Sequence, residues 1–171
     1  HVNLTNHSYW NLEKIKKNMI YNHELKLNSN KYLQINKDLI PTGKTKSIKN
    51  SIYDFLKFQN LGKKLNFFKN KKIDLKHKGF DTTYIVKKNS RNFVGSLKNN
   101  NSNVQVDFFS NLPGVQLYSA QNLNYKKKLF PYQGICLETQ YFPDTPNKKN
   151  FPSTLIKANK RYTCFTKIKI Y

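Results

Sequence analysis

Cysteine is scarce in this sequence of 171 residues, and long hydrophobic runs and glycine-rich loops are missing. The two cysteines, Cys136 and Cys164, are far apart and lack the paired spacing of a zinc or redox motif. We therefore expect two reduced, half-buried thiols, with a single disulfide as the alternative. No apolar stretch approaches the ~18 residues that a membrane-spanning helix needs. These absences argue against a membrane helix, a cysteine-based metal motif and a glycine-rich phosphate-binding loop.

Acidic side chains and arginine are also scarce. Lys and Arg number 31 against 9 Asp and Glu, which gives a formal net charge of +22. Such a balance is typical of proteins that bind nucleic acid or an anionic membrane. However, Arg91 and Arg161 are the only arginines, and arginine is the residue that binds guanine or phosphate through paired hydrogen bonds. Because lysine and asparagine are enriched together, we interpret the charge as a bias toward A- and T-rich codons and expect neither partner.

Short alternating segments are what the sequence does contain. They lie at residues 2–9, 21–27, 31–35, 83–86, 93–97, 104–109, 115–120, 134–140 and 161–171, with turn signals between them, including one at residues 40–43. Between Ile52 and Phe68, the spacing of Ile52, Phe55, Leu56 and Phe58 also permits a helical turn or two. With 12 Phe and 11 Tyr, the core is expected to be aromatic. One all-β domain, a sandwich or barrel, is predicted rather than a βαβ design.

Glu138 is the most unusual residue in this pattern. Alternation places Ile135 and Leu137 on one face of its strand, and Cys136, Glu138 and Gln140 on the other. Burial of an unpaired charge is costly, so the carboxylate must border water, join a polar network or take part in chemistry in a cleft. The sequence alone leaves these three interpretations open.

Three further polar residues are candidates for the same site. His7 is a candidate because histidine is the residue type suited to proton transfer near neutral pH, although a lone histidine is more often structural. Asp81 follows a predicted corner and could cap it, form the turn or bind a ligand. Gln116 shares a strand face with Tyr118, and an amide beside an aromatic ring is common in sugar sites.

Four motifs in sequence order resemble those of the aldose 1-epimerases, also called galactose mutarotases. They are Asn-Leu-Thr-Asn-His-Ser-Tyr at 3–9, Gly-Phe-Asp at 79–81, Pro-Gly-Val-Gln-Leu-Tyr at 113–118, and Cys-Leu-Glu-Thr-Gln followed by Pro-Asp within 136–144. The resemblance implies an antiparallel β-sandwich of the galactose mutarotase-like supersandwich type, with an open sugar cleft on one sheet. It also implies an isomerase that interconverts the α and β anomers of galactose or glucose.

The resemblance assigns a role to each candidate residue. His7 matches the general acid that protonates the ring oxygen, and Glu138 matches the general base that accepts the proton of the anomeric hydroxyl. Asp81 and Gln116 match positions that bind sugar hydroxyls. Such chemistry needs no cofactor and no metal, and the histidines have no zinc-site spacing. We expect a cytoplasmic protein, with a monomer favoured.

The resemblance covers residues 1–171 but only the C-terminal part of the family's single domain. We therefore expect that the N-terminal part lies upstream of His1, together with an arginine and a second histidine of the same cleft. Thr82 stands where relatives often carry His, and Tyr132-Gln133 replaces the usual Lys-His. A non-catalytic sugar-binding paralogue or an inactive fragment is the alternative, followed by a basic nucleic-acid-binding protein. A sugar phosphate is disfavoured because such sites usually contain arginines.

Overall fold

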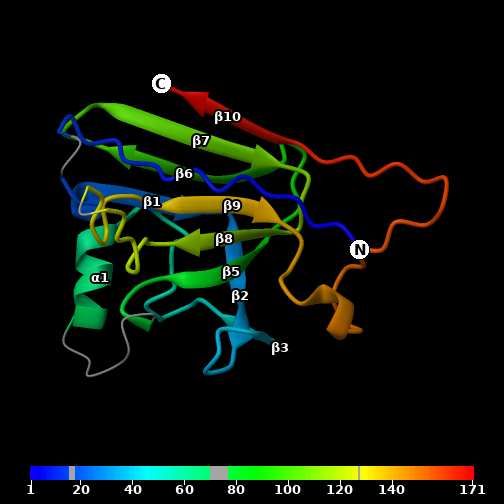
Figure 1. The fold of residues 1–171 in the computed structure, drawn as a ribbon. Helices are drawn as coiled ribbons and strands as arrows, with labels where there is room; N and C mark the ends of the chain where they lie inside the picture. Colours follow the sequence, from blue (N-terminus) through cyan, green and yellow to red (C-terminus); the bar gives the residue numbers. More distant parts are fainter. Residues whose placement is uncertain (16–17, 70–76, 127) are drawn as a thin grey trace.

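Two five-stranded antiparallel sheets packed face to face form the protein (Figure 1). The computed structural model describes residues 1–15, 18–69, 77–126 and 128–171. The first sheet has the order β10 (Thr166–Ile170), β7 (Val104–Ser110), β6 (Phe93–Asn99), β1 (His23–Leu27) and β4 (Gln59–Asn60). The second sheet has the order β3 (Pro41–Ser47), β2 (Ser29–Ile35), β5 (Asp81–Val86), β8 (Gly114–Tyr118) and β9 (Cys136–Gln140). The predicted all-β sandwich is confirmed.

The core lies between the inner faces of the two sheets. Because side chains alternate along a strand, a strand that faces the core, such as β1, contributes every second residue to it. Leu25, Leu97 and Phe108 come from the first sheet, and Tyr84 and Leu117 from the second. Tyr84, Phe55, Phe80 and Phe108 are among the largest fully buried side chains, and several of these rings meet edge to face. The prediction of an aromatic core is confirmed.

The helix α1 (Leu61–Lys69) covers one end of the sandwich beside β1 (Figure 1). Asn60 precedes it, and its Oδ1 accepts a hydrogen bond from the backbone N–H of Lys63, which caps the helix. Leu61, Leu65 and Phe68 form its buried stripe. Helical turns were expected between Ile52 and Phe68 from the spacing of Ile52, Phe55, Leu56 and Phe58, and α1 lies largely within that range. Residues 52–58 form turns and bends, and the helix begins after them.

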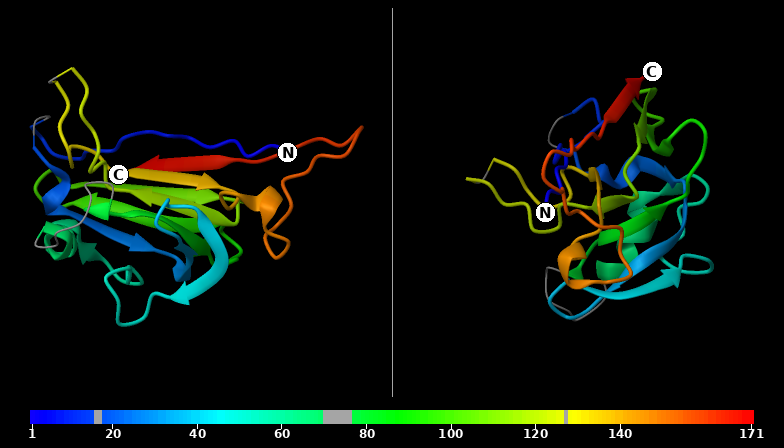
Figure 2. Two further views of the ribbon diagram at one scale, coloured as in Figure 1. Left: turned by 60° about the horizontal axis from the view of Figure 1, so that its bottom comes forward. Right: turned by 90° about the vertical axis from the view of Figure 1, so that its right-hand side faces the viewer.

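The strand predicted at residues 2–9 is not present. This segment is extended but forms no backbone ladder with a strand, so side chains hold it against β9. The Asn3 amide donates to the carbonyl of Tyr141 (3.1 Å) and accepts from its N–H (2.8 Å). Trp10 then exchanges two backbone hydrogen bonds with Ile135. Figure 2 shows the segment running along the side of the sandwich next to β9 and β10.

Two other predicted elements occupy residues that differ from the prediction. The turn predicted at residues 40–43 lies earlier, at residues 36–39, because the Asn36 side chain accepts from the N–H groups of Asp38 and Ile40. Pro41 therefore begins β3. The closing strand predicted at 161–171 is confined to β10, while the hairpin of β6 and β7 is confirmed.

Both cysteines are free thiols. In the described part of the chain, no helix is long and apolar enough to cross a membrane.

Candidate active site

The strand register of the second sheet brings the predicted site residues together on its outer face. Gln116 on β8 pairs directly with Glu138 on β9. On its other side, Gln116 pairs with Thr83 of β5, two positions after Asp81. Residues of three strands that are distant in sequence thus become neighbours, because paired positions in an antiparallel sheet point to the same face.

His7 reaches this face from the N-terminal segment. Its Nε2 lies 3.2 Å from Glu138 Oε1, and its Nδ1 lies 3.6 Å from Cys136 Sγ. The segment is fixed on both sides of His7, by Asn3 at the end of β9 and by Trp10, which packs edge-on against Phe108 in the core. The imidazole therefore spans two side chains of β9 that are two positions apart.

Asp81, Gln116 and Thr83 form a connected chain of hydrogen bonds. The Thr83 hydroxyl donates to Gln116 Oε1. The Gln116 amide in turn donates to Asp81 Oδ1 at 2.5 Å. Since the Thr83 hydroxyl and the Asp81 carboxylate hold opposite ends of the amide group, they fix its orientation. The amide has a second N–H and the carboxylate a second oxygen, and among the residues that the structure describes neither has a hydrogen-bond partner.

His7, Asp81, Gln116 and Glu138 are among the residues that line an open cleft of about 430 Å³. A volume of this size lies within the range of small-molecule sites. The rings of Tyr9 and Tyr118 stand at its side, with their centroids 5.1 and 6.3 Å from that of His7. Gly134 lets the segment approach closely, because a Cβ there would lie 3.0 Å from Cβ of Tyr9. The cleft therefore combines charged, amide and aromatic groups.

Burial and neighbouring charges set the protonation of the cleft. Burial raises the pKa of Glu138, the His7 imidazole opposes this rise, and the nearby Asp81 adds to it. Burial also raises the pKa of Asp81, against the effect of the Gln116 hydrogen bond and His7. The Cys136 thiol, buried beside the same carboxylates, has its pKa raised to about 12. The arrangement is a carboxylate and an imidazole in contact, beside a neutral thiol.

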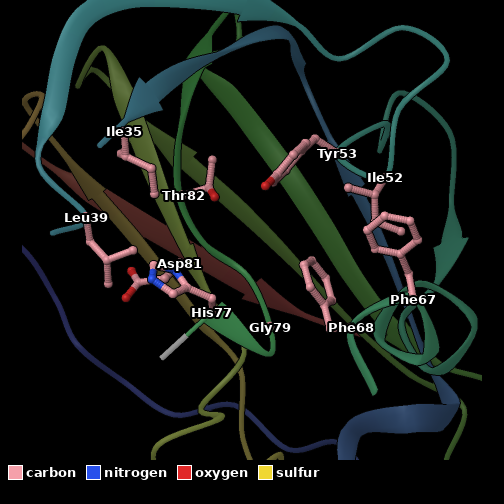
Figure 3. Close-up of a pocket in the computed structure, with 10 residues that line it drawn as sticks. All are labelled: Ile35, Leu39, Ile52, Tyr53, Phe67, Phe68, His77, Gly79, Asp81 and Thr82. Carbon is pink, nitrogen blue, oxygen red and sulfur yellow. The ribbon is translucent and has the colours of Figure 1, made fainter. Parts of the chain in front are cut away.

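Asp81 also borders a second pocket of about 370 Å³, in which aromatic rings form part of the lining. Figure 3 shows Tyr53, Phe67 and Phe68 on its far side and His77 beside Asp81. Asp81 thus lies at the boundary between a polar cleft and an aromatic pocket.

Tyr9, which lines the cleft, and Thr83 and Cys136, which contact its residues, escaped the sequence analysis as functional candidates. Thr83 and Cys136 lie on the same strand faces as Gln116 and Glu138, so alternation was the signal that could have found them. Tyr9 carries no such signal, because the segment at residues 2–9 is not a strand. One ligand atom each from His7, Cys136 and Glu138 lies within 4.8 Å of the others, a group that could hold a metal ion.

Comparison with known proteins agrees with this arrangement. A family profile described as aldose 1-epimerase matches residues 1–169. Galactose mutarotase from Pongo abelii is 33% identical over 168 residues, and that from Bos taurus is 34% identical over 169. In each case the match covers 94% of the chain but 47% of the relative, so the chain spans about half the length of these relatives.

Solved structures show the same fold. The aldose epimerase homologue from C. elegans superposes with a TM-score of 0.82 at 21% identity, over 99% of this chain and 50% of that one. Galactose 1-epimerase from Lactobacillus acidophilus superposes with a TM-score of 0.64 at 18% identity, over 90% of this chain and 45% of that one.

Proposed function

The chain belongs to the aldose 1-epimerase family, and on that premise we propose that it interconverts the α and β anomers of a hexose. The single observation that supports this most strongly is the contact of 3.2 Å between His7 Nε2 and Glu138 Oε1. A base and an acid side by side, in a cleft of sugar size, are what opening of a cyclic hemiacetal requires.

The reaction moves two protons. Glu138 accepts the proton of the C1 hydroxyl while protonated His7 donates one to the ring oxygen. The bond between C1 and the ring oxygen breaks, and a carbonyl forms at C1. After rotation about the C1–C2 bond, the hydroxyl formed from the ring oxygen attacks the other face of the carbonyl. His7 now accepts the proton of this hydroxyl, and Glu138 returns its proton to the oxygen on C1. Neither a full oxyanion nor a full oxonium ion forms if the transfers are concerted, and this lowers the barrier.

Asp81 and Gln116 bind the sugar hydroxyls in this proposal. A hydroxyl both donates and accepts, and it matches a carboxylate oxygen and an amide N–H held at neighbouring positions. The hydrogen bonds that link Thr83, Gln116 and Asp81 support the assignment, because an amide that is already fixed loses little conformational freedom when a sugar binds. The aromatic rings of Tyr9 and Tyr118 supply apolar surface for the C–H groups of the sugar ring.

We infer that residues 1–171 form the C-terminal part of a single family domain. The support is that the match with galactose mutarotase from Pongo abelii covers 94% of this chain but 47% of that relative. Galactose and glucose are the first substrates to test, as free sugars and not as phosphates. Two free cysteines suit a reducing compartment such as the cytoplasm, and we propose a monomer with no nucleic-acid or membrane partner.

A sugar-binding protein without turnover is the second candidate. It is favoured by the observation that the chain spans about half of its relatives, because the family resemblance places an arginine and a second histidine of the cleft upstream. Replacement of both in the upstream sequence, with hexose binding but no exchange of anomers, would indicate this function. Salt-resistant binding of nucleic acid at ~0.15 M would instead support the charge-based alternative.

Polarimetry on freshly dissolved α-galactose and α-glucose tests the proposed activity in the full-length protein. We expect Glu138→Gln to lower kcat at least about a hundredfold, because it removes the base. Glu24→Gln is the matched control. Glu24 lies on the first sheet and pairs with Lys98, so activity should be unchanged. Equal activity of both variants would contradict the role of Glu138.

A further inference from the structure

An uncommon group of side chains for a site that moves only protons lies in and directly beside the cleft. A thiol, an imidazole and a carboxylate meet there, from Cys136, His7 and Glu138, with one ligand atom of each within 4.8 Å of the others. Among the residues that the structure describes, these three side chains are of metal-ligating types and lie close enough together to hold one metal ion. The proposed hexose reaction uses the imidazole and the carboxylate but leaves the thiol without a role.

Two of these ligands are already fixed. Cys136 and Glu138 are two positions apart on β9, so both project from the same face. Both are buried, with exposed fractions of 0% and 7%, and the strand leaves them little freedom. Two ligands held in this way lower the entropic cost of binding an ion.

The third ligand is adaptable. The His7 side chain is 51% exposed and belongs to a segment outside any strand. Its two ring nitrogens face different partners, Nδ1 toward Cys136 Sγ and Nε2 toward Glu138 Oε1. A single ion takes one of these nitrogens, so the ring must turn slightly while the ligands on β9 stay in place.

The distances suit a tetrahedral ion. Bond lengths of about 2.3 Å to sulfur and about 2.0–2.2 Å to nitrogen and oxygen place ligand atoms roughly 3.3–3.8 Å apart. The contacts of His7 with Glu138 and with Cys136 are 3.2 and 3.6 Å, measured from Nε2 and Nδ1, and one ligand atom of each residue lies within 4.8 Å of the others, so a turn of the ring would bring the three ligands to this spacing. Thiolate and imidazole ligands select borderline-soft ions such as Zn²⁺ over Mg²⁺ or Ca²⁺. The open cleft supplies the fourth position, as in zinc sites that keep a place for water.

We propose that this cleft binds a thiophilic divalent cation of the Zn²⁺ class through Cys136 Sγ, one ring nitrogen of His7 and a carboxylate oxygen of Glu138. The ion replaces the thiol proton, which is released to solvent, and no oxidation or reduction takes place. Its effect on activity rests on the proposed function. By occupying the base and the acid together, the ion excludes the anomeric end of the hexose and inhibits the enzyme reversibly.

Cadmium is the probe that tests the site itself, because a Cd²⁺–thiolate bond absorbs in the ultraviolet. We expect titration of the reduced, chelator-treated protein with Cd²⁺ to produce this band at one equivalent. Cys136→Ser should abolish the band, and Cys164→Ser, the matched control at the other cysteine, should retain it. A band that survives in Cys136→Ser and disappears in Cys164→Ser would overturn the proposal.

The other two ligands are tested by affinity. Cys136 remains in His7→Asn and Glu138→Gln, so the absorption band should persist in both variants. The affinity for Cd²⁺ should fall more than about tenfold in each, because loss of even a group that only orients a ligand costs about tenfold or more. Unchanged affinity in both variants would show binding by the thiol alone and would overturn the three-ligand site. Circular dichroism confirms that both variants are folded.

Activity separates this proposal from the proposed function. In the wild type we expect Zn²⁺ to raise the apparent KM for hexose with kcat unchanged, and a chelator to reverse this. A three-ligand Cd²⁺ site in a protein that never exchanges anomers would support the metal site and contradict the enzyme. An active enzyme with no Cd²⁺ band would overturn the metal site alone.

Discussion

The two faces of β5, β8 and β9 carry side chains of opposite chemistry. The inner face carries Tyr84, Leu117 and Leu137 into the core, while the outer face carries Gln116 and Glu138 into the cleft. Burial does not distinguish them, because Leu137 is 3% exposed and Glu138 is 7% exposed. What differs is how each buried group is satisfied, by apolar packing inside and by hydrogen bonds and ion pairing outside.

This comparison shows why one stretch of sequence serves both stability and chemistry. Neighbouring residues of a strand point to opposite faces, so a shift of one position would exchange the core set and the cleft set. The two sets should therefore fail in different ways when they are changed. Inner-face substitutions should lower the free energy of unfolding, and outer-face substitutions should lower catalysis or binding.

The largest effect is expected from His7→Asn, in the cleft. Loss of a general acid lowers kcat about 10²–10⁴-fold, or about 3–5 kcal/mol in activation free energy. Because His7 is half-exposed, the melting temperature should change little. Stopped-flow polarimetry and thermal unfolding measure the two quantities. Retained kcat would assign the proton donor to another group.

The inner face is tested by Leu117→Ala. Leu117 is fully buried in the core, and such a truncation costs about 2–5 kcal/mol of unfolding free energy because of lost transfer energy and a remaining cavity. Denaturant unfolding measures this loss. Activity per folded molecule should remain near that of the wild type, and a drop in kcat comparable to that of His7→Asn would erase the distinction between the faces.

His23 sharpens the comparison because it is a polar residue on the inner side of β1. It is buried, its Nε2 accepts from the backbone N–H of Leu12 at 2.7 Å, and burial lowers its pKa to about 4. Between pH 6.5 and 4 the unfolded state binds a proton that the native state does not. Stability is therefore full above pH 6.5 and declines as pH falls through this window, by about 3 kcal/mol at most.

His23→Gln is the control for that prediction. Unfolding free energy measured at pH 7, 5.5 and 4 should fall less steeply in this variant than in the wild type, because the titrating group is absent. Parallel pH profiles would show that His23 is not the group responsible.

The smallest effect is expected from Thr83→Val, which removes the hydroxyl that orients Gln116. One hydrogen bond contributes about 0.5–1.5 kcal/mol net, so KM for hexose should rise roughly two- to tenfold with kcat nearly unchanged. Thr83→Ser, which restores a hydroxyl, should recover most of the affinity. A change in kcat without a change in KM would contradict a role in binding.

Several strands and one hairpin were predictable from local pattern. The alternation around Glu138 and the spacing of β6 and β7 are short-range signals, and each agrees with the observed element. Residues 2–9 show the limit of such reasoning. They alternate like a strand, yet their polar groups bind β9 through side chains such as that of Asn3, and no alternation rule distinguishes these two ways of pairing.

The sequence by itself determined the fold class, the family motifs and the four candidates His7, Asp81, Gln116 and Glu138, because these depend on local alternation and residue type. The tertiary structure alone decided which groups meet. His7 and Cys136 are 129 positions apart, and no spacing rule relates them. Their contact exists because Asn3 and Trp10 hold an extended segment against the edge of β9. That packing places the imidazole between a thiol and a carboxylate, and so creates the proposed acid–base pair and the proposed metal site together.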